Sequence, residues 1–299
     1  MRMSSRLHPR FASHPHSRVS CAVALVLAFT GAASAAPLSG LPAGPLGQSI
    51  QRGHDMIMDT GADSQMKVHV GNALSCNSCH TDGGNNDHPG NFLSTATRFP
   101  SYSKREDAVI TLEDRIANCF MRSMNGMRPG TDSQVVVDMA AYISWLDRGK
   151  PILAPRAPAA PSPYPAMLKS AGRADVAAGA RVYASSCASC HGATGAGVAG
   201  AFPPLWGPDS YNAGAGLANV AKLATWVKGN MPLGNAHLTE KEAFEVALFV
   251  DTQARPDFVL SQHLPPGTRP DDYNARVRSE TDTVESNLRK VGLSLQALR

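Results

Sequence analysis

The sequence is poor in aromatic residues, which make up only 6% of its 299 positions. This low aromatic content predicts small domains whose cores are built around something other than their own side chains. Long apolar runs are also missing. The one extended run, CAVALVLAFTGAASA at 21–35, is shorter than the roughly 20 residues that a transmembrane helix needs. The sequence therefore gives no reason to expect a membrane anchor.

That short run closes an N-terminal export signal. Four arginines and no acidic residue precede it, and it ends in the small-residue pattern ASA at 33–35. We predict cleavage after Ala35, because a cut one residue later would leave Pro37 directly behind it. Cys21 stands before the apolar run instead of at its end, which argues against a lipoprotein. The mature chain, residues 36–299, is expected in the periplasm.

A basic excess is absent from the mature chain. The full sequence has a formal net charge of +4, and this excess equals the four arginines of the signal. A neutral mature chain gives no argument for nucleic acid or for an acidic membrane as a partner. Its length suffices for two compact domains.

Five cysteines remain in the mature chain, and four of them form two copies of the motif C-x-x-C-H, at 76–80 and 187–191. This motif attaches c-type haem: the two thiols add to the vinyl groups, and the adjacent histidine becomes the proximal iron ligand. The sequence therefore predicts two covalently bound haems. Their attachment residues are Cys76, Cys79, Cys187 and Cys190, and their proximal ligands are His80 and His191.

Two other uses of the motifs compete with haem. A thioredoxin-like redox pair would not require the histidine. A zinc site would have to pool ligands from two motifs that lie 111 residues apart. Because an exported chain carries the complete motif twice, we prefer haem attachment to both alternatives.

The surroundings of the two motifs repeat as well. The T-x-x-Q of 131–134 and the T-x-x-E of 239–242 match capping boxes, and each opens a segment with helical apolar periodicity. We also expect a helix before each motif, over 50–58 and over 175–186. Each half then has the arrangement of a small cytochrome c domain. The expected apolar faces are Val136, Met139, Ile143 and Leu146 in the first half, and Ala243, Val246 and Val250 in the second.

The predicted fold is all-α, with two cytochrome c domains joined by a proline-rich linker. The stretch PILAPRAPAAPSPYP at 151–165 holds too much proline for a helix or a central strand, so we expect a semi-rigid connector. After Pro270 the chain turns polar, and a short peripheral helix or a partly disordered tail fits it equally well. The predicted boundaries are a signal at 1–35, a first domain at 36–150, a linker at 151–172, a second domain at 173–266 and a tail at 267–299.

Each haem iron has a sixth coordination position that a second side chain can fill. In the second half the candidate is Met231 in the string NMPLG, 40 residues after His191 and just before the C-terminal helix. Thioether ligation raises the reduction potential of a haem, which suits the haem from which electrons leave. A loop methionine is ordinarily core filling, but a cytochrome c domain supplies its ligand at this position.

The first half has no matching Met-Pro, but it has the fifth cysteine. Cys119 lies 39 residues after His80, close to the spacing in the second half. An unpaired thiol is a liability in an oxidising compartment unless it is hidden or used, and the flanking Arg115 and Arg122 favour the thiolate that ligates metal. We therefore predict Cys119 as the distal ligand of the first haem. The alternatives are a buried structural cysteine with one of Met121, Met124, Met127, His54, His69 and His88 as ligand.

Several strings around these positions match a known family. They are VGNALSCNSCH, FPSYSKRE, RIANCFMRSMNG, CASCHG, PPLWGPDSYNAGAG and NMPLG. Through them the chain resembles, over about residues 45–260, the dihaem thiosulfate dehydrogenases. The resemblance implies a periplasmic oxidoreductase that couples two thiosulfates into tetrathionate and, in some members, runs the reverse reaction. It also implies a small periplasmic electron carrier as partner, such as a c-type cytochrome or a high-potential iron–sulfur protein.

Site roles follow from the same resemblance. The first haem is implied to be catalytic, with Cys119 as its distal ligand, and the second to transfer electrons. Some members have a lysine before the distal methionine of the second haem. Asn230 stands at that place in this chain, which favours stable ligation by Met231. The implied catalytic residues are Cys119, Arg105, Arg115 and Ser123.

These residue types suit the implied reaction. Thiosulfate is a dianion, so bringing two together requires positive charge, and guanidinium groups offer a planar fork for oxyanions. Two other functions stay open at this point. A dihaem electron carrier without substrate chemistry would normally place methionine or histidine where Cys119 stands. A thiosulfate-binding cytochrome subunit of a sulfur-oxidising complex would require a partner subunit, and it explains the NMPLG string less well.

Overall fold

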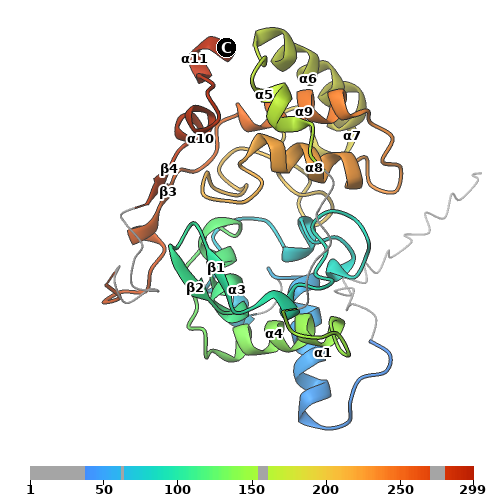
Figure 1. Cartoon of the computed structure of the whole chain (residues 1–299), viewed down its shortest axis with the longest axis vertical. Coiled ribbons are helices and arrows are strands. Elements are labelled where there is room, and N and C mark those ends of the chain that lie inside the picture. The colour runs from blue at the N-terminus through green and yellow to red at the C-terminus, as the bar shows by residue number, and fades with distance from the viewer. Residues whose placement is uncertain (1–37, 62–63, 154–160, 270–279) are drawn as a thin grey trace, which may run out of the picture. The chain divides into compact units, whose positions relative to one another are not determined.

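The chain is mostly helical, and its two halves share the same pair of framing helices (Figure 1). In each half a helix precedes the haem motif, and a second helix ends the half and packs against the first. These pairs are α1 (Pro45–Met58) with α4 (Gln134–Leu146), and α6 (Arg173–Ser186) with α9 (Glu240–Asp251). Both helices expected before the motifs are thus present, and each begins earlier than predicted. The computed structural model describes residues 38–61, 64–153, 161–269 and 280–299.

Shorter elements connect and extend the two pairs. Two antiparallel strand pairs accompany the helices: β1 (Ser101–Ser103) with β2 (Ala108–Ile110), and β3 (Phe258–Val259) with β4 (Thr281–Asp282). The remaining helices are α2 (Ser64–Lys67), α3 (Leu112–Arg122), α5 (Tyr164–Leu168), α7 (Ala188–His191), α8 (Val220–Asn230), α10 (Val284–Lys290) and α11 (Leu295–Leu298). The 3₁₀ turns are η1 (Cys76–Ser78), η2 (Asp82–Gly84), η3 (Ala96–Arg98) and η4 (Leu260–Gln262).

A glycine lets each helix pair cross closely. A Cβ atom on Gly53 of α1 would lie 2.0 Å from the carbonyl oxygen of Asp138 in α4. A Cβ atom on Gly179 of α6 would lie 2.0 Å from the carbonyl oxygen of Glu245 in α9. Any larger residue would push the two backbones apart. The same device in both halves supports the internal repeat that the sequence predicts.

Two large hydrophobic cores form around these crossings, one in each half. The apolar faces predicted for α4 and α9 are buried in them, so both faces are confirmed. A third, smaller cluster joins α3 to the segment that follows α9. Its members are Met121, Phe258, Leu260 and Leu264.

The beginning of α4 corrects one prediction. The helix starts directly after Ser133, whose hydroxyl accepts the backbone N–H of Val136. The capping box expected from Thr131 therefore does not form, because Ser133 offers the same hydroxyl directly before the apolar run. The second capping box is confirmed: the hydroxyl of Thr239 accepts the N–H of Glu242, whose carboxylate accepts the N–H of Thr239.

The segments on both sides of the second domain take part in its core. Tyr164 and Leu168 of α5 are buried there. The last residues of the proline-rich stretch thus begin a short helix, which tolerates Pro165 in its first turn because the missing N–H has no partner there. In the tail, Leu288 of α10 and Leu298 of α11 are buried in the same core. Of the two possibilities for the tail, the peripheral helix is confirmed over the described residues.

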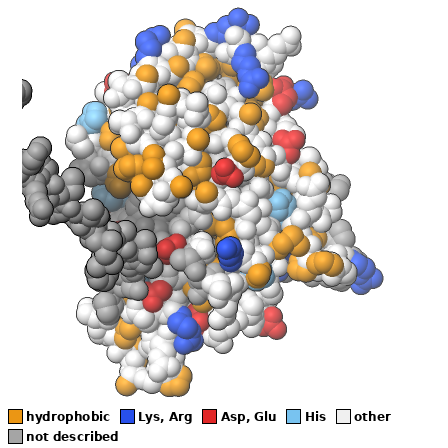
Figure 2. Space-filling model, turned by 180° about the vertical axis from the view of Figure 1, so that it is seen from behind, with side chains coloured by type: hydrophobic (Ala, Val, Ile, Leu, Met, Phe, Trp, Pro, Cys, Tyr) orange, Lys and Arg blue, Asp and Glu red, His pale blue; other side chains and the backbone are white. Residues whose placement is uncertain are grey.

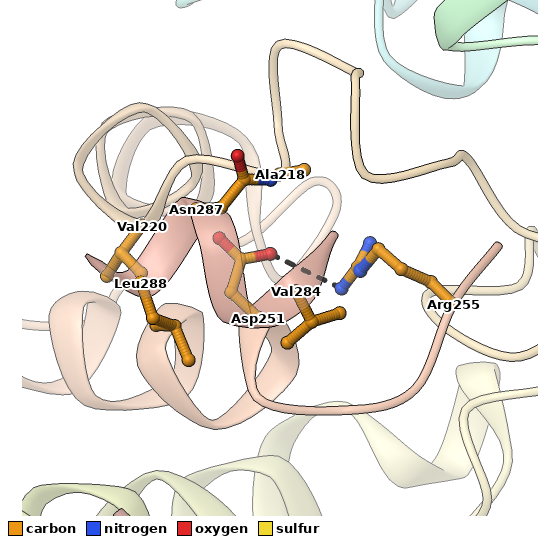
Figure 3. Close-up of a pocket in the computed structure, with 7 residues that line it drawn as sticks. All are labelled: Ala218, Val220, Asp251, Arg255, Val284, Asn287 and Leu288. Atoms are coloured by element: carbon orange, nitrogen blue, oxygen red, sulfur yellow. Dashed lines mark hydrogen bonds and ion pairs between the residues drawn. The ribbon is translucent and has the colours of Figure 1, made fainter. Parts of the chain in front are cut away.

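A buried ion pair lies where the tail meets the second core (Figure 3). Arg255 Nη2 donates to Asp251 Oδ1 at 3.3 Å. Burial raises the pKa of Asp251 to about 7, although the Arg255 charge acts in the opposite direction. The pair lines a cavity of about 10 Å³, close to the smallest space that holds one water molecule. The other lining residues are Ala218, Val220, Val284, Asn287 and Leu288.

The surface carries charges of both signs. On the face shown in Figure 2, Lys and Arg side chains are scattered and interspersed with Asp and Glu. Across the described ranges, no helix is long and apolar enough to cross a membrane. The predicted signal at 1–35 lies outside the described residues.

Candidate functional site

Each haem motif folds into a helical turn that holds its histidine in the same way. The Nδ1 atom of His80 lies 2.5 Å from the carbonyl oxygen of Gly90, and Nδ1 of His191 lies 2.9 Å from that of Pro203. A carbonyl oxygen only accepts, so Nδ1 carries the proton in both rings. The Nε2 atom is thereby left to bind iron, and the hydrogen bond fixes the ring orientation.

The surroundings of His80 favour a neutral ring. Burial lowers the pKa of His80 to about 4, and the positive charge of Arg115 acts in the same direction. The ring stacks on Phe92, with 4.3 Å between the centroids. Neutral imidazole is the form that ligates a metal, so His80 is in a suitable state at neutral pH.

The four motif cysteines are unpaired thiols. Burial raises the pKa of Cys76 to about 11, that of Cys79 to about 12 and that of Cys187 to about 11. Protonated thiols in apolar surroundings fit thioether attachment better than zinc ligation, which needs thiolates. Within the described part of the chain, no three His, Cys, Asp or Glu side chains are placed to hold a metal ion together. The pooled zinc site therefore has no geometric support there.

Cys119 lies on α3 and interacts electrostatically with the cysteines of the first motif. Arg115, one helical turn earlier, places Nη1 3.3 Å from the Cys119 sulfur. Burial raises the pKa of Cys76 and Cys79, and negative charge on Cys119 raises it further. Such an effect requires the three sulfurs to lie within electrostatic range of one another. The predicted distal ligand and the attachment cysteines of the first motif are therefore within electrostatic range of one another.

The other ligand candidates of the first half have different surroundings. Met121 and Met124 are buried in hydrophobic clusters. The rings of His54 and His69 each pack edge-on against an aromatic side chain. These four side chains therefore have packing roles of their own. The remaining two are Met127, which lines a surface groove, and His88, which is exposed.

Arg105 and Ser123 border the same region as Cys119. Arg105 lies between β1 and β2, with Nε 4.0 Å from a carboxylate oxygen of Glu280. Burial lowers the pKa of Arg105, and the positive charges of Arg122 and Arg115 lower it further. Ser123 follows α3, and its backbone N–H donates to the Cys119 carbonyl at 2.9 Å. The Ser123 hydroxyl makes no hydrogen bond to another described residue.

Arg122 corrects the expectation that two arginines flank the Cys119 sulfur. It is 1% exposed, and its guanidinium donates to both carboxylate oxygens of Glu280, at 3.0 and 2.6 Å. The guanidinium also lies 4.2 Å from the ring centroid of Phe258. These contacts hold Arg122 on the tail side of α3. Of the two arginines, only Arg115 contacts the sulfur.

Met231 directly follows α8 and packs against the second core together with Cys187. The residues before it have a role that the sequence did not indicate. Trp226 Nε1 donates to the carbonyl of Cys79 at 2.8 Å, and Asn230 Nδ2 donates to the carbonyl of Pro89 at 2.9 Å. The helix that ends at the second distal candidate therefore rests on the first haem motif.

Two family models match the chain. Residues 60–152 match the "SoxA/TsdA, cytochrome c domain" model. Residues 174–250 match the "Cytochrome C oxidase, cbb3-type, subunit III" model. The chain thus contains two cytochrome c domains, which imply c-type haems.

Several known proteins are similar over most of the chain. A thiosulfate dehydrogenase from Allochromatium vinosum is 42% identical, over 73% of this chain and 82% of that protein. Another from Thiomonas intermedia is 35% identical, over 81% of this chain and 76% of that protein. The solved structure of the thiosulfate dehydrogenase TsdBA from Marichromatium purpuratum, as isolated, superposes with a TM-score of 0.65 at 33% identity. The match covers 77% of this chain and half of the TsdBA chain.

Proposed function

We propose that this chain, which belongs to the thiosulfate dehydrogenase family, is a periplasmic dihaem enzyme that couples two thiosulfates into tetrathionate. The contact between Cys119 and Arg115 carries the proposal, because it places a guanidinium 3.3 Å from a lone sulfur beside the first haem motif. An electron carrier without substrate chemistry does not need a cation at such a sulfur. The same groups would serve the reverse reaction, the reduction of tetrathionate.

The residues fit two covalently attached haems. Both motif histidines keep Nε2 free of the hydrogen bond that fixes the ring, and both motifs offer two unpaired thiols. Bound there, each haem supplies an iron that takes up one electron. We assign Cys76, Cys79, His80 and Cys119 to the first haem, and Cys187, Cys190, His191 and Met231 to the second.

The side chains of the first domain have to gather two dianions. In the overall reaction one sulfur–sulfur bond forms between the terminal sulfurs of two thiosulfates, two electrons leave, and no proton is exchanged. Arg105 and Arg115 would hold sulfonate oxygens through charge-assisted hydrogen bonds. The Ser123 hydroxyl would add a further donor. Arg115 would also stabilise negative charge on Cys119 through the hydrogen bond to its sulfur.

The distal side chains set the direction of electron transfer. Thiolate donation lowers the reduction potential of a haem, and thioether donation raises it. Electrons from thiosulfate would therefore pass from the Cys119-ligated haem to the Met231-ligated haem. The contacts of Trp226 with Cys79 and of Asn230 with Pro89 support this route, because they hold the helix before Met231 against the first haem-binding segment. A small periplasmic electron carrier would then take the electrons from the second haem.

Compartment and domain limits complete the proposal. A cleaved signal at 1–35 would direct the chain to the periplasm. We place the first domain at 36–150 and the second at 173–266. The burial of Tyr164 and Leu288 shows that both flanking segments add to the second core.

The test is an assay of purified, haem-loaded protein with thiosulfate and an artificial electron acceptor, and with tetrathionate and a reduced dye. Wild type should be active in at least one direction. Cys119→Gly should retain two haems per chain by intact mass and lose both activities together. Lys169→Gln, at an exposed position of the second domain, is a control that should remain fully active.

Each result would have a clear meaning. A wild-type protein with two haems and no turnover in either direction would favour the electron-carrier function. A Cys119→Gly variant with two haems and normal turnover would show that another group performs the sulfur chemistry.

A further inference from the structure

The C-terminal end of α3, which carries Cys119, is held by a residue of the second domain. The last four carbonyl groups of an α-helix have no partner within the helix. In α3 the carbonyls of Cys119 and Phe120 accept N–H groups from the turn that follows. The carbonyls of Met121 and Arg122 have another donor, because both accept hydrogen bonds from Asn212. Two of the four terminal carbonyls therefore depend on one residue outside the first domain.

Asn212 binds the helix end with its backbone and its side chain together. Its N–H donates to the Arg122 carbonyl at 3.3 Å. Its Nδ2 donates to the Met121 carbonyl at 2.8 Å and to Asn125 Oδ1 at 2.9 Å. Its Oδ1 accepts the N–H of Gly214 at 3.0 Å, and the residue is 0% exposed. Every polar group of this buried side chain is thus satisfied, and three of its four hydrogen bonds hold the end of α3 and the turn behind it.

A second asparagine joins the same helix end to the first haem motif. Asn72 lies four residues before the motif. Its Nδ2 donates to the Ser123 carbonyl at 2.8 Å and to the Ser210 carbonyl at 3.2 Å. Ser210 is two residues before Asn212 in the same loop. The segment before the motif, the end of α3 and the second-domain loop are therefore fastened to one another by two buried or half-buried amides.

We infer that Asn212 is a positioning residue for Cys119, through which the second domain fixes the distal sulfur of the first haem. The inference rests on the proposed role of Cys119 as distal ligand and extends that role to the second domain. Met121 is 0% exposed and Arg122 is 1% exposed, so without Asn212 their carbonyls would be buried and unpaired unless the helix end moved. The last turn of α3 begins at Cys119, so such a movement would displace its sulfur.

The test measures how readily cyanide displaces Cys119 in oxidised, haem-loaded, full-length protein. Cyanide binds the iron after the sulfur has left, so its apparent Kd for the first haem reports how firmly Cys119 is held. Asn212→Ala should lower this Kd about tenfold, because hydrogen bonds that fix the helix end are lost. The thiolate signal of the first haem in electron paramagnetic resonance should disappear at correspondingly lower cyanide concentrations. The thioether band of Met231 shows separately whether the second haem reacts.

Asn287→Ala is the matched control. Asn287 Nδ2 donates to the Ala213 carbonyl at 2.7 Å, so this variant removes an amide-to-carbonyl hydrogen bond beside Asn212 and spares both α3 carbonyls. It should leave the cyanide Kd unchanged even if it lowers the unfolding temperature. Asn212→Ser leaves a smaller cavity than alanine but is too short to replace the amide, so it should shift the Kd in the same direction as Asn212→Ala.

The outcomes separate this inference from the proposed function. An unchanged cyanide Kd in the Asn212 variants, or an equal fall in Asn287→Ala, would overturn the inference. Failure of both Asn212 variants to bind two haems would also overturn it, because Asn212 would then serve folding. Wild-type protein whose first haem shows no thiolate ligation would instead remove the proposed role of Cys119.

Discussion

The ion pair between Arg122 and Glu280 fastens the C-terminal tail to the helix that carries Cys119. Arg122 Nη1 donates to Glu280 Oε1 at 3.0 Å and Nη2 donates to Oε2 at 2.6 Å, and the Arg122 side chain is 2% exposed. Glu280→Gln would leave the Arg122 charge buried without its main partner. We expect this substitution to destabilise the folded chain strongly.

The magnitude follows from the burial of the two partners. Removing one partner of a buried ion pair costs about 3–5 kcal/mol. The Glu280 side chain is 20% exposed, and Glu106 lies 3.9 Å from Arg122, so water and a second carboxylate compensate in part. The lower end, about 3 kcal/mol, is therefore the expected loss. For a chain of this size that loss lowers the unfolding temperature by about 6 °C or more.

The assay is thermal unfolding of haem-loaded Glu280→Gln, followed by helix content. Arg289→Gln is the matched control, because it breaks a pair with Glu285 in which the Arg289 side chain is 73% exposed. Such a pair contributes at most about 1 kcal/mol. The double variant Arg122→Met with Glu280→Gln should recover part of the loss, since no buried charge remains. If Glu280→Gln unfolds at the same temperature as Arg289→Gln, the tail contact does not stabilise α3 and the reasoning fails.

Two further predictions concern the second domain. Met231→Gly should abolish the thioether-to-iron charge-transfer band of the oxidised protein while two haems remain attached, and a surviving band would point to another ligand. Burial raises the pKa of Asp251 from 3.8 to about 7 in the folded chain. Between about pH 4 and pH 7 the folded chain therefore holds a proton that the unfolded chain has released, so the folded chain should become less stable as the pH rises through this window. The unfolding temperature of wild type should therefore fall relative to that of Asp251→Asn across this window, and parallel pH profiles would contradict it.

The features that the sequence predicted well depend on short stretches of chain. The haem motifs, the helix before each motif and the Thr239 cap are each contained within a few residues. Even at this range one choice went wrong, because Thr131 and Ser133 carry the same hydroxyl and only the start of α4 decides between them. The close crossings at Gly53 and Gly179 were missed, since a glycine within a helical pattern does not reveal which backbone approaches it.

Contacts between distant segments could not be predicted in this way. Trp226 and Cys79 are 147 residues apart, and Asn230 and Pro89 are 141 apart. In the sequence, Asn230 was notable only because it stands where some family members have a lysine that can bind the haem iron. In the structure its amide donates to the carbonyl of Pro89, in the loop after the first haem motif, and thereby joins the two domains. No local pattern marks such a residue, because its partner is defined by how the domains pack.

The cations around Cys119 show the same limit most clearly. On a helix, residues three and four positions away are both neighbours, so Arg115 and Arg122 were equally able to reach the Cys119 sulfur. Glu280 lies 158 residues after Arg122 and binds its guanidinium, which keeps Arg122 away from the Cys119 sulfur. The tail thereby leaves Arg115 as the arginine of this pair that contacts the sulfur, so the charge beside Cys119 depends on how segments far apart in the sequence come together.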